Sequence, residues 1–168
     1  MNKKIKIIAE IGPNHNGSIF LARKLIRAAK NCGADYVKFQ TFKTENMIVR
    51  NAKKAIYQKK NTQNNDNQFE MLKKLELSFD NFLNLKKYSD KIGIKFLTTC
   101  FDFESLKFSK KLKMDYCKIA SGEIDNFPLI KEICKQAKKI ILSTGMSNFK
   151  QVSQTVNFII KNNFNKNN

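Results

Sequence analysis

The sequence predicts an α/β fold, namely an incomplete (β/α)8 barrel of the TIM type with about five βα units. Five short apolar segments alternate along the chain with segments of helical apolar periodicity, which indicates a parallel sheet with helical crossovers. A doubly wound sheet fits the same alternation. Polar residues follow all five predicted strands, and this favours the barrel, because a doubly wound sheet concentrates its ligand at one switch point.

Cap and turn residues set the limits of the elements. Ser18 can cap the first helix, Gly33 and Gly93 can end the first and second helices, and Pro128 suits the first turn of the fourth. The expected strands are 5–10, 35–40, 94–99, 116–120 and 139–144. The expected helices lie between Ser18 and Gly33 and over 79–92, 104–113, 128–136 and 148–160.

Residues 41–78 are expected to form a long polar connection that includes the low-complexity stretch Gln58–Gln68. A connection of this length is usually functional or mobile. Residues 1–160 are interpreted as the N-terminal portion of a barrel domain, and 161–168 as a polar tail. Four glutamates are expected to be solvated helix or loop charges; they are Glu45, Glu70, Glu76 and Glu104.

The net charge of +18 comes from 32 Lys and Arg residues against 14 Asp and Glu residues. Because the lysines are dispersed, the charge does not indicate a nucleic-acid partner, which would need basic residues on one face interleaved with stacking aromatics. Attraction of anionic small molecules is the preferred interpretation.

No apolar run reaches the ~20 residues that a membrane span needs, and no apolar signal segment follows Met1. We therefore expect no membrane partner and a cytoplasmic location. The four cysteines form no C-x-x-C pair, and His15 is the single histidine. Neither a disulfide framework nor a zinc site is expected, and His15 is interpreted as a hydrogen-bonded loop residue.

The polar groups at the strand ends suit recognition of an anionic substrate. Lys38 and Lys118 would anchor a phosphate or carboxylate, and Glu123 would act as general acid or base. Glu10 would accept hydrogen bonds from a sugar. The hydroxyl donors would be Thr99, Ser121 and Ser143, and the full set at the strand ends is Glu10, Lys38, Gln40, Thr98, Thr99, Lys118, Ser121, Glu123, Ser143 and Thr144.

Five sequence motifs, one per strand, resemble the nonulosonic (sialic) acid synthase family, in the order of that family. The resemblance is to its N-acetylneuraminate and legionaminate synthase branches, and to the N-terminal part of the barrel only. The motifs are spread along nearly the whole chain between Ile7 and Met146. They are EIGPNHNG at 10–17, GADYVKFQT at 33–41, FLTTCFD at 96–102, KIASGE at 118–123 and LSTGM at 142–146.

The resemblance implies condensation of phosphoenolpyruvate with an N-acetylmannosamine-type sugar, giving a nonulosonic acid and phosphate. Carried over by motif, Glu123 would handle a proton, Glu10 would touch the sugar and Gln40 would support it. The residues that would hold phosphoenolpyruvate are Lys38, Thr99, Lys118, Ser121 and Ser143.

The resemblance also implies a divalent metal, Mn²⁺ or Mg²⁺, that polarises the sugar aldehyde. The family's metal-binding histidines lie on later strands, and no residue of this chain matches them. The family's C-terminal antifreeze-like domain has no counterpart in the sequence either. Full-length members of such a family would form domain-exchanged homodimers.

Two other functions are compatible with the sequence. The chain could be a catalytically inactive fragment or binding module that retains part of a phosphoenolpyruvate site. The +18 charge keeps a nucleic-acid-binding domain as a third hypothesis, which salt-sensitive affinity for nucleic acid would support.

Overall fold

A computed structural model describes residues 5–52 and 66–162. Its strands form one sheet in the order β1-β2-β3-β4-β5, and every neighbouring pair is parallel. A doubly wound sheet reverses its strand order at a switch point, whereas a barrel adds strands in chain order. The sheet is therefore an arc of a barrel, as predicted. The strands are β1 (Ile8–Glu10), β2 (Tyr36–Thr41), β3 (Lys95–Cys100), β4 (Cys117–Ile119) and β5 (Ile140–Leu142).

Side-chain caps begin the main helices. Ser18, Ser78 and Asn148 cap α1, α5 and α8, and each accepts a hydrogen bond from the backbone N–H three residues further on. The helices are α1 (Ile19–Asn31), α2 (Thr44–Met47), α4 (Gln68–Leu75), α5 (Phe79–Lys91), α6 (Phe103–Ser109), α7 (Phe127–Gln136) and α8 (Phe149–Lys161), with 3-10 helices η1 (Lys110–Leu112) and η2 (Ser121–Glu123). No described helix is long and apolar enough to cross a membrane.

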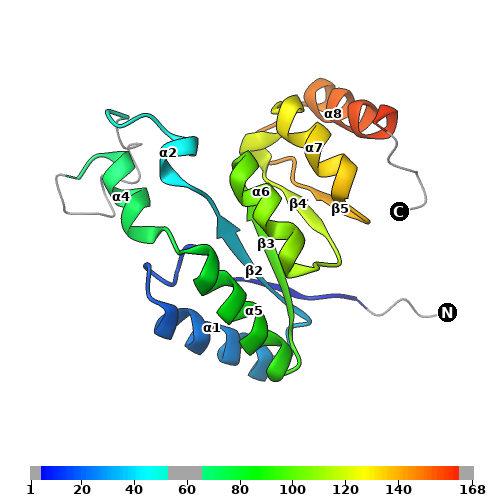
Figure 1. The fold of residues 1–168 in the computed structure, drawn as a ribbon. Coiled ribbons are helices and arrows are strands. Elements are labelled where there is room, and N and C mark those ends of the chain that lie inside the picture. Colours follow the sequence, from blue (N-terminus) through cyan, green and yellow to red (C-terminus); the bar gives the residue numbers. More distant parts are fainter. Residues whose placement is uncertain (1–4, 53–65, 163–168) are drawn as a thin grey trace.

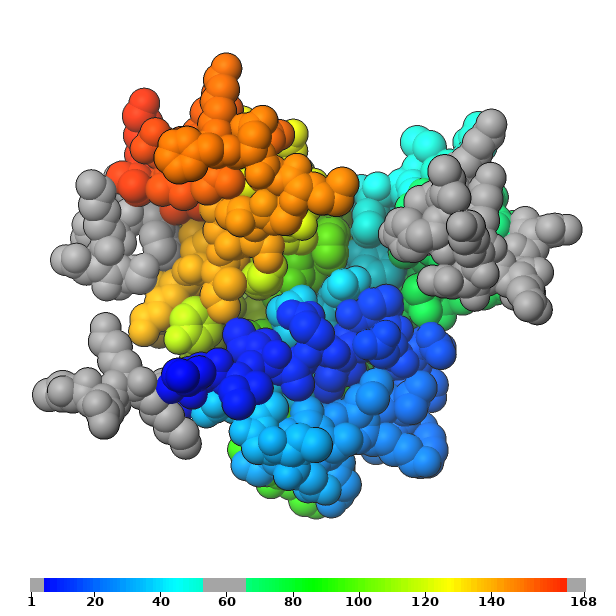
Figure 2. Space-filling model, turned by 180° about the vertical axis from the view of Figure 1, so that it is seen from behind, coloured from blue at the N-terminus to red at the C-terminus, as the bar shows by residue number. Residues whose placement is uncertain are grey.

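The helices line one side of the sheet, with α1 and α5 beside β2 and β3 and with α7 and α8 beside β4 and β5 (Figure 1). Seen from behind, the N-terminal part of the described chain (blue) and the part from β5 to α8 (orange to red) form separate regions of the same face, with yellow and green atoms between them (Figure 2). Because side chains alternate along a strand, one set of residues faces the helices and the other faces away from them.

The first core cluster joins β2 and β3 to α1 and α5. Its centre is Phe39, which is fully buried. The Phe39 ring stacks on Phe96 with a centroid distance of 5.0 Å and meets Phe82 edge-on at 6.2 Å. Such pairs stabilise the fold beyond the burial of their area. This cluster fixes the strand that carries Lys38 and Gln40.

The second core cluster joins β4 to α7 and α8. Ile119 of β4 packs with Leu129, Ile130 and Ile133 of α7 and with Ile159 of α8. All five side chains are buried. This cluster is aliphatic, and it fixes the strand that carries Lys118.

The prediction of one polar connection over 41–78 was wrong, because α2 and α4 lie within it. Asn67 and Glu70 form a capping box at the start of α4, and this Asn-x-x-Glu spacing is a helix-start signal that the prediction did not use. Residues 58–65 of the low-complexity stretch fall outside the described part of the chain.

Other limits moved by a few residues. β4 and β5 have three residues each, fewer than predicted. Lys161 belongs to α8 rather than to the tail, and Asn162 ends that helix. The rest of the predicted tail, 163–168, lies outside the described residues.

Candidate functional site

The register of the sheet brings five predicted site residues to the face that the helices leave open. Glu10 is opposite Lys38, and Gln40 is opposite Thr99, which in turn is opposite Lys118. Residues opposite one another in a sheet, or two apart on one strand, share a face. Lys38 and Gln40 are two apart, so the five side chains belong to one surface near the carboxyl ends of the strands.

Thr98 lies at the same strand end as Thr99, the predicted hydroxyl donor, but is not part of this surface. Its hydroxyl lies 2.7 Å from the hydroxyl of Thr41, and both side chains are buried. Alternation places Thr98 on the helix side of β3, whereas Thr99 is on the open side.

Lys38 is the deepest cation of the site. Its side chain is 8% exposed, and its ammonium nitrogen Nζ lies 2.8 Å from Oε2 of Glu10. Nζ also donates a hydrogen bond of 3.4 Å to Oγ1 of Thr99. A charge at this depth needs a partner, and the Glu10 carboxylate supplies it.

Lys118 has neutral partners only. Its Nζ donates to Oγ of Ser143 at 2.6 Å and to the backbone oxygen of Ile119 at 3.0 Å. Burial lowers the pKa of Lys118, and the positive charge of Lys38 lowers it further, against the opposing influence of Glu10. The two lysines are therefore close enough to repel each other, which is the condition under which an added anion is stabilised.

Ser121 and Glu123 belong to the turn η2 that follows β4. Both are half-buried. Oε2 of Glu123 accepts a hydrogen bond of 2.6 Å from Nδ2 of Asn126, and Asn126 also caps α7 through Leu129. A Cβ placed on Gly145 would lie 3.5 Å from Oγ of Ser121, so the loop after β5 passes close to this hydroxyl. Asn126 is a positioning residue that the sequence prediction did not include.

The loop after β1 approaches β2 very closely. A Cβ on Gly12 would lie 2.8 Å from the backbone nitrogen of Gln40, so only glycine fits there. His15 is buried in the same loop, and its Nδ1 accepts a hydrogen bond from the backbone of Gly17. This confirms the prediction of a hydrogen-bonded loop histidine. The Gln40 side chain makes no hydrogen bond to another described residue, which leaves its amide available to a ligand.

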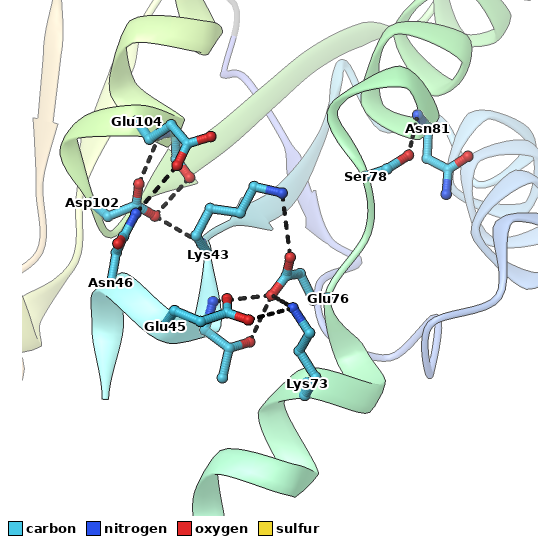
Figure 3. Close-up of polar contacts among 11 residues, drawn as sticks. Lys43, Glu45, Asn46, Lys73, Glu76, Ser78, Asn81, Asp102 and Glu104 are labelled. Carbon is cyan, nitrogen blue, oxygen red and sulfur yellow. Dashed lines mark hydrogen bonds and ion pairs between the residues drawn. The ribbon is translucent and has the colours of Figure 1, made fainter. Parts of the chain in front are cut away.

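Glu76 is a further positioning residue, and the prediction that it is solvated was wrong. Its side chain is 9% exposed. Its Oε2 accepts hydrogen bonds from the backbone nitrogen of Thr44 at 3.0 Å and from the Thr44 hydroxyl at 2.8 Å. Lys43 and Lys73 reach the same carboxylate from two sides (Figure 3). Glu76 therefore holds the segment that directly follows β2 against the end of α4.

The other three glutamates are exposed, as expected. Glu45 pairs with Lys73 at 2.9 Å, Glu70 belongs to the capping box of α4, and Glu104 accepts from Asn46 at 3.3 Å. The segment after β2 is also tied to α6, because the backbone nitrogen of Lys43 donates to Asp102 at 2.8 Å.

The described residues do not fit the metal that the resemblance implies. They contain no group of three or more His, Cys, Asp or Glu side chains that could hold a metal ion. His15 has its Nδ1 occupied by Gly17. The site described above instead brings together two lysines, hydroxyl groups and the carboxylates of Glu10 and Glu123.

A family model, described as the NeuB family, matches residues 25–167 of the sequence. The chain belongs to the NeuB family. An N,N'-diacetyllegionaminic acid synthase of Campylobacter jejuni is 49% identical over 160 residues, which are 95% of this chain and 48% of that protein. The enzyme of the same name from Legionella pneumophila is 42% identical over 91% of this chain and 43% of its own length. The chain thus spans about half the length of these NeuB relatives.

Solved structures agree with the barrel. An N-acetylneuraminic acid synthetase of Leptospira borgpetersenii superposes with a TM-score of 0.80 at 28% identity, over 96% of this chain and 52% of that one. A truncated 3-deoxy-D-arabino-heptulosonate 7-phosphate synthase of Thermotoga maritima superposes with a TM-score of 0.66 at 15% identity, over 96% and 48%. The second likeness concerns the fold alone. The NeuB chain is thus the corresponding part of a TIM-type barrel, as predicted.

Proposed function

We propose that the chain provides the phosphoenolpyruvate half of a nonulosonic acid synthase site. The enzyme would condense phosphoenolpyruvate with an N-acetylmannosamine-type sugar and release phosphate. The observation that supports this most is the pair Lys38 and Lys118, which face one surface on the two strands that flank β3. Lys38 donates to the Thr99 hydroxyl, and Lys118 lies opposite Thr99 in the sheet. Two cations with hydroxyl donors between them match a small molecule that carries both a phosphate and a carboxylate.

In this proposal the chain's residues bind and orient the anionic substrate. Lys38 and Lys118 neutralise its phosphate and carboxylate, and the hydroxyls of Thr99, Ser121 and Ser143 fix their orientation. Fixing two reactants removes much of the entropic barrier of a bimolecular condensation. Carbon 3 of phosphoenolpyruvate bonds to the sugar aldehyde carbon, water adds at carbon 2, and the resulting tetrahedral intermediate expels phosphate.

Glu123 is proposed as the proton-transfer group of that sequence. It is half-buried in the turn that starts at Ser121, and Asn126 holds one of its oxygens at 2.6 Å. A carboxylate held in this way can take the proton of the attacking water or give one to the leaving phosphate. Glu10 and Gln40, on the β1 side of the lysines, are proposed to face the sugar.

The finer assignment follows the named relatives. The chain is most similar, among the relatives described above, to legionaminic acid synthases, so the proposed sugar is an acylated hexosamine of the N-acetylneuraminate or legionaminate type. A metal-assisted reaction would need ligands other than the described residues, so no step is assigned to a metal here. We propose a homodimer for the full-length enzyme, as the resemblance implies.

The test is phosphoenolpyruvate binding by the 168-residue chain, measured by titration calorimetry. Mn²⁺-dependent phosphate release in the presence of N-acetylmannosamine is measured on the chain completed with the remaining part of a NeuB barrel. Lys38→Ala should weaken binding, whereas Lys135→Ala, which removes an exposed lysine of α7, should not. Phosphate release supports the synthase. Binding without release supports the alternative of a non-catalytic module, and no binding contradicts the anion site.

A further inference from the structure

The two lysines of the proposed site differ in their partners. Lys38 has a carboxylate partner, Oε2 of Glu10 at 2.8 Å. Among the described residues, the partners of Lys118 are the Ser143 hydroxyl and a backbone oxygen. One cation of the site is therefore already neutralised by the protein, and the other is open to an incoming anion.

Burial shows which member of the ion pair can move. The Lys38 side chain is 8% exposed, whereas the Glu10 side chain is 60% exposed. Lys38 lies in the middle of β2 between two paired strands, and Glu10 is the last residue of β1. The carboxylate can return to water at small cost, but the ammonium cannot leave without losing its buried position.

We propose that Glu10 is an internal anion that occupies Lys38 in the empty site and is displaced by the anionic group of phosphoenolpyruvate. This inference rests on the function proposed above. Phosphoenolpyruvate first meets Lys118, whose ammonium group donates to the Ser143 hydroxyl and to a backbone oxygen and forms no ion pair with a described residue. Its second anionic group then replaces Glu10 on Lys38, and the displaced carboxylate turns towards solvent and the sugar side of the site.

The exchange makes sugar binding depend on phosphoenolpyruvate. While Lys38 holds the Glu10 carboxylate, that oxygen is a poor acceptor for a sugar hydroxyl. Once phosphoenolpyruvate has taken Lys38, the carboxylate is free to accept one. The empty site therefore has one cation less than its two lysines suggest, which limits the binding of unrelated anions such as inorganic phosphate.

The experiment compares the 168-residue chain with Glu10→Gln and Glu10→Asp, using phosphoenolpyruvate and inorganic phosphate as probes in calorimetry. Glu10→Gln removes the competing charge and should increase the affinity for both anions by about fivefold, the scale of a partly exposed ion pair. The shorter Glu10→Asp should fall between Glu10→Gln and the native chain. The matched control is Glu45→Gln, which breaks an exposed ion pair of 2.9 Å with Lys73 and removes the same charge.

Tighter binding by Glu10→Gln and unchanged binding by Glu45→Gln support the exchange. If Glu10→Gln and Glu45→Gln tighten phosphoenolpyruvate binding equally, the effect comes from the net charge of the chain, and the proposed exchange is wrong. If the native chain binds phosphoenolpyruvate and Glu10→Gln binds it no better, the exchange is wrong while the proposed function stands. If neither protein binds phosphoenolpyruvate, the proposed function fails and the exchange fails with it.

Discussion

The two core clusters hold the sheet with different strength. The first contains twelve buried residues around Phe39, and the second contains eight around Ile119, none of them aromatic. β2 and β3 pair over six residues, β4 and β5 over three, and β3 joins β4 through the single opposite pair Thr99 and Lys118. The sheet is thus a broad first part and a narrow second part that meet at this pair.

The candidate site lies across that junction. Lys38 comes from the first part, Lys118 and Ser143 come from the second, and Thr99 is at the boundary. An anion bound to both lysines would link the two parts at their narrowest connection. On the proposed function, phosphoenolpyruvate affinity would therefore depend on how firmly the narrow second part is held against the broad first part.

Core truncation should show the largest difference between the parts. Phe39→Ala should lower the free energy of unfolding by about 4 kcal/mol, since it removes a fully buried ring. Ile119→Ala should cost about 2 kcal/mol, because the smaller second cluster can collapse around the gap. Urea denaturation of both variants checks this, and a larger loss for Ile119→Ala would reverse the comparison.

Glu123 lies in the second part of the sheet, after β4, so a variant of this residue tests whether the second part contributes to the reaction as well as to binding. In a chain completed to the length of its NeuB relatives, Glu123→Gln should reduce phosphate release by at least ~10²-fold, the scale of general acid–base catalysis, with little change in phosphoenolpyruvate affinity. The amide oxygen still accepts from Asn126, so the turn is kept. Initial rates of phosphate release and calorimetry measure the two effects, and an unchanged rate would remove Glu123 from the mechanism.

Lys38 and Lys118 come from different parts of the sheet, so their alanine variants measure how much each part contributes to phosphoenolpyruvate binding. Lys38→Ala should weaken phosphoenolpyruvate binding by about thirtyfold, because it removes a cation and leaves the Glu10 carboxylate facing the ligand. Lys118→Ala should weaken phosphoenolpyruvate binding by about tenfold, a smaller loss, since no paired carboxylate is left behind. Adding Glu10→Gln to Lys38→Ala should recover the affinity of Lys118→Ala. If both single variants bind like the native chain, the anion site is wrongly placed.

A change at Glu76 should have the smallest effect, a loss of stability in the segment that follows β2 in the first part. Burial raises the pKa of Glu76, but the hydrogen bonds from Thr44 and Lys73 outweigh it and keep the pKa below the ordinary value of 4.5. Because the folded pKa is lower than the unfolded one, this stabilisation is present above pH 4.5 and is lost as the pH falls through the folded value.

Glu76→Gln should therefore remove about 1 kcal/mol of stability at neutral pH and flatten the pH profile below the ordinary glutamate value. Urea denaturation from pH 7 to pH 3 measures both effects. Glu104→Gln, which changes an exposed glutamate bonded to Asn46, is the control and should leave the profile unchanged. The same slope in both variants would contradict the assignment.

Much of the fold could be predicted because it depends on local signals. The caps at Ser18 and Asn148 and the helix limits at Gly33 and Gly93 are encoded within one turn of sequence. Strand-end polarity placed Lys38 and Lys118 in one site. The prediction that Glu76 is solvated failed, because the exposure of a side chain depends on which distant element packs over it.

The sequence by itself determined the order of strands and helices and the family motifs. It also singled out the candidate lysines, hydroxyl residues and Glu123. Only the tertiary structure decided which of these side chains share a face, that Glu10 neutralises Lys38 while Lys118 keeps neutral partners, and that Glu76 is buried. The physical reason is that periodicity and capping act over a few residues. Register, burial and ion pairing depend on contacts between strands and loops that lie tens of residues apart in the chain, such as Glu10 with Lys38 and Thr44 with Glu76.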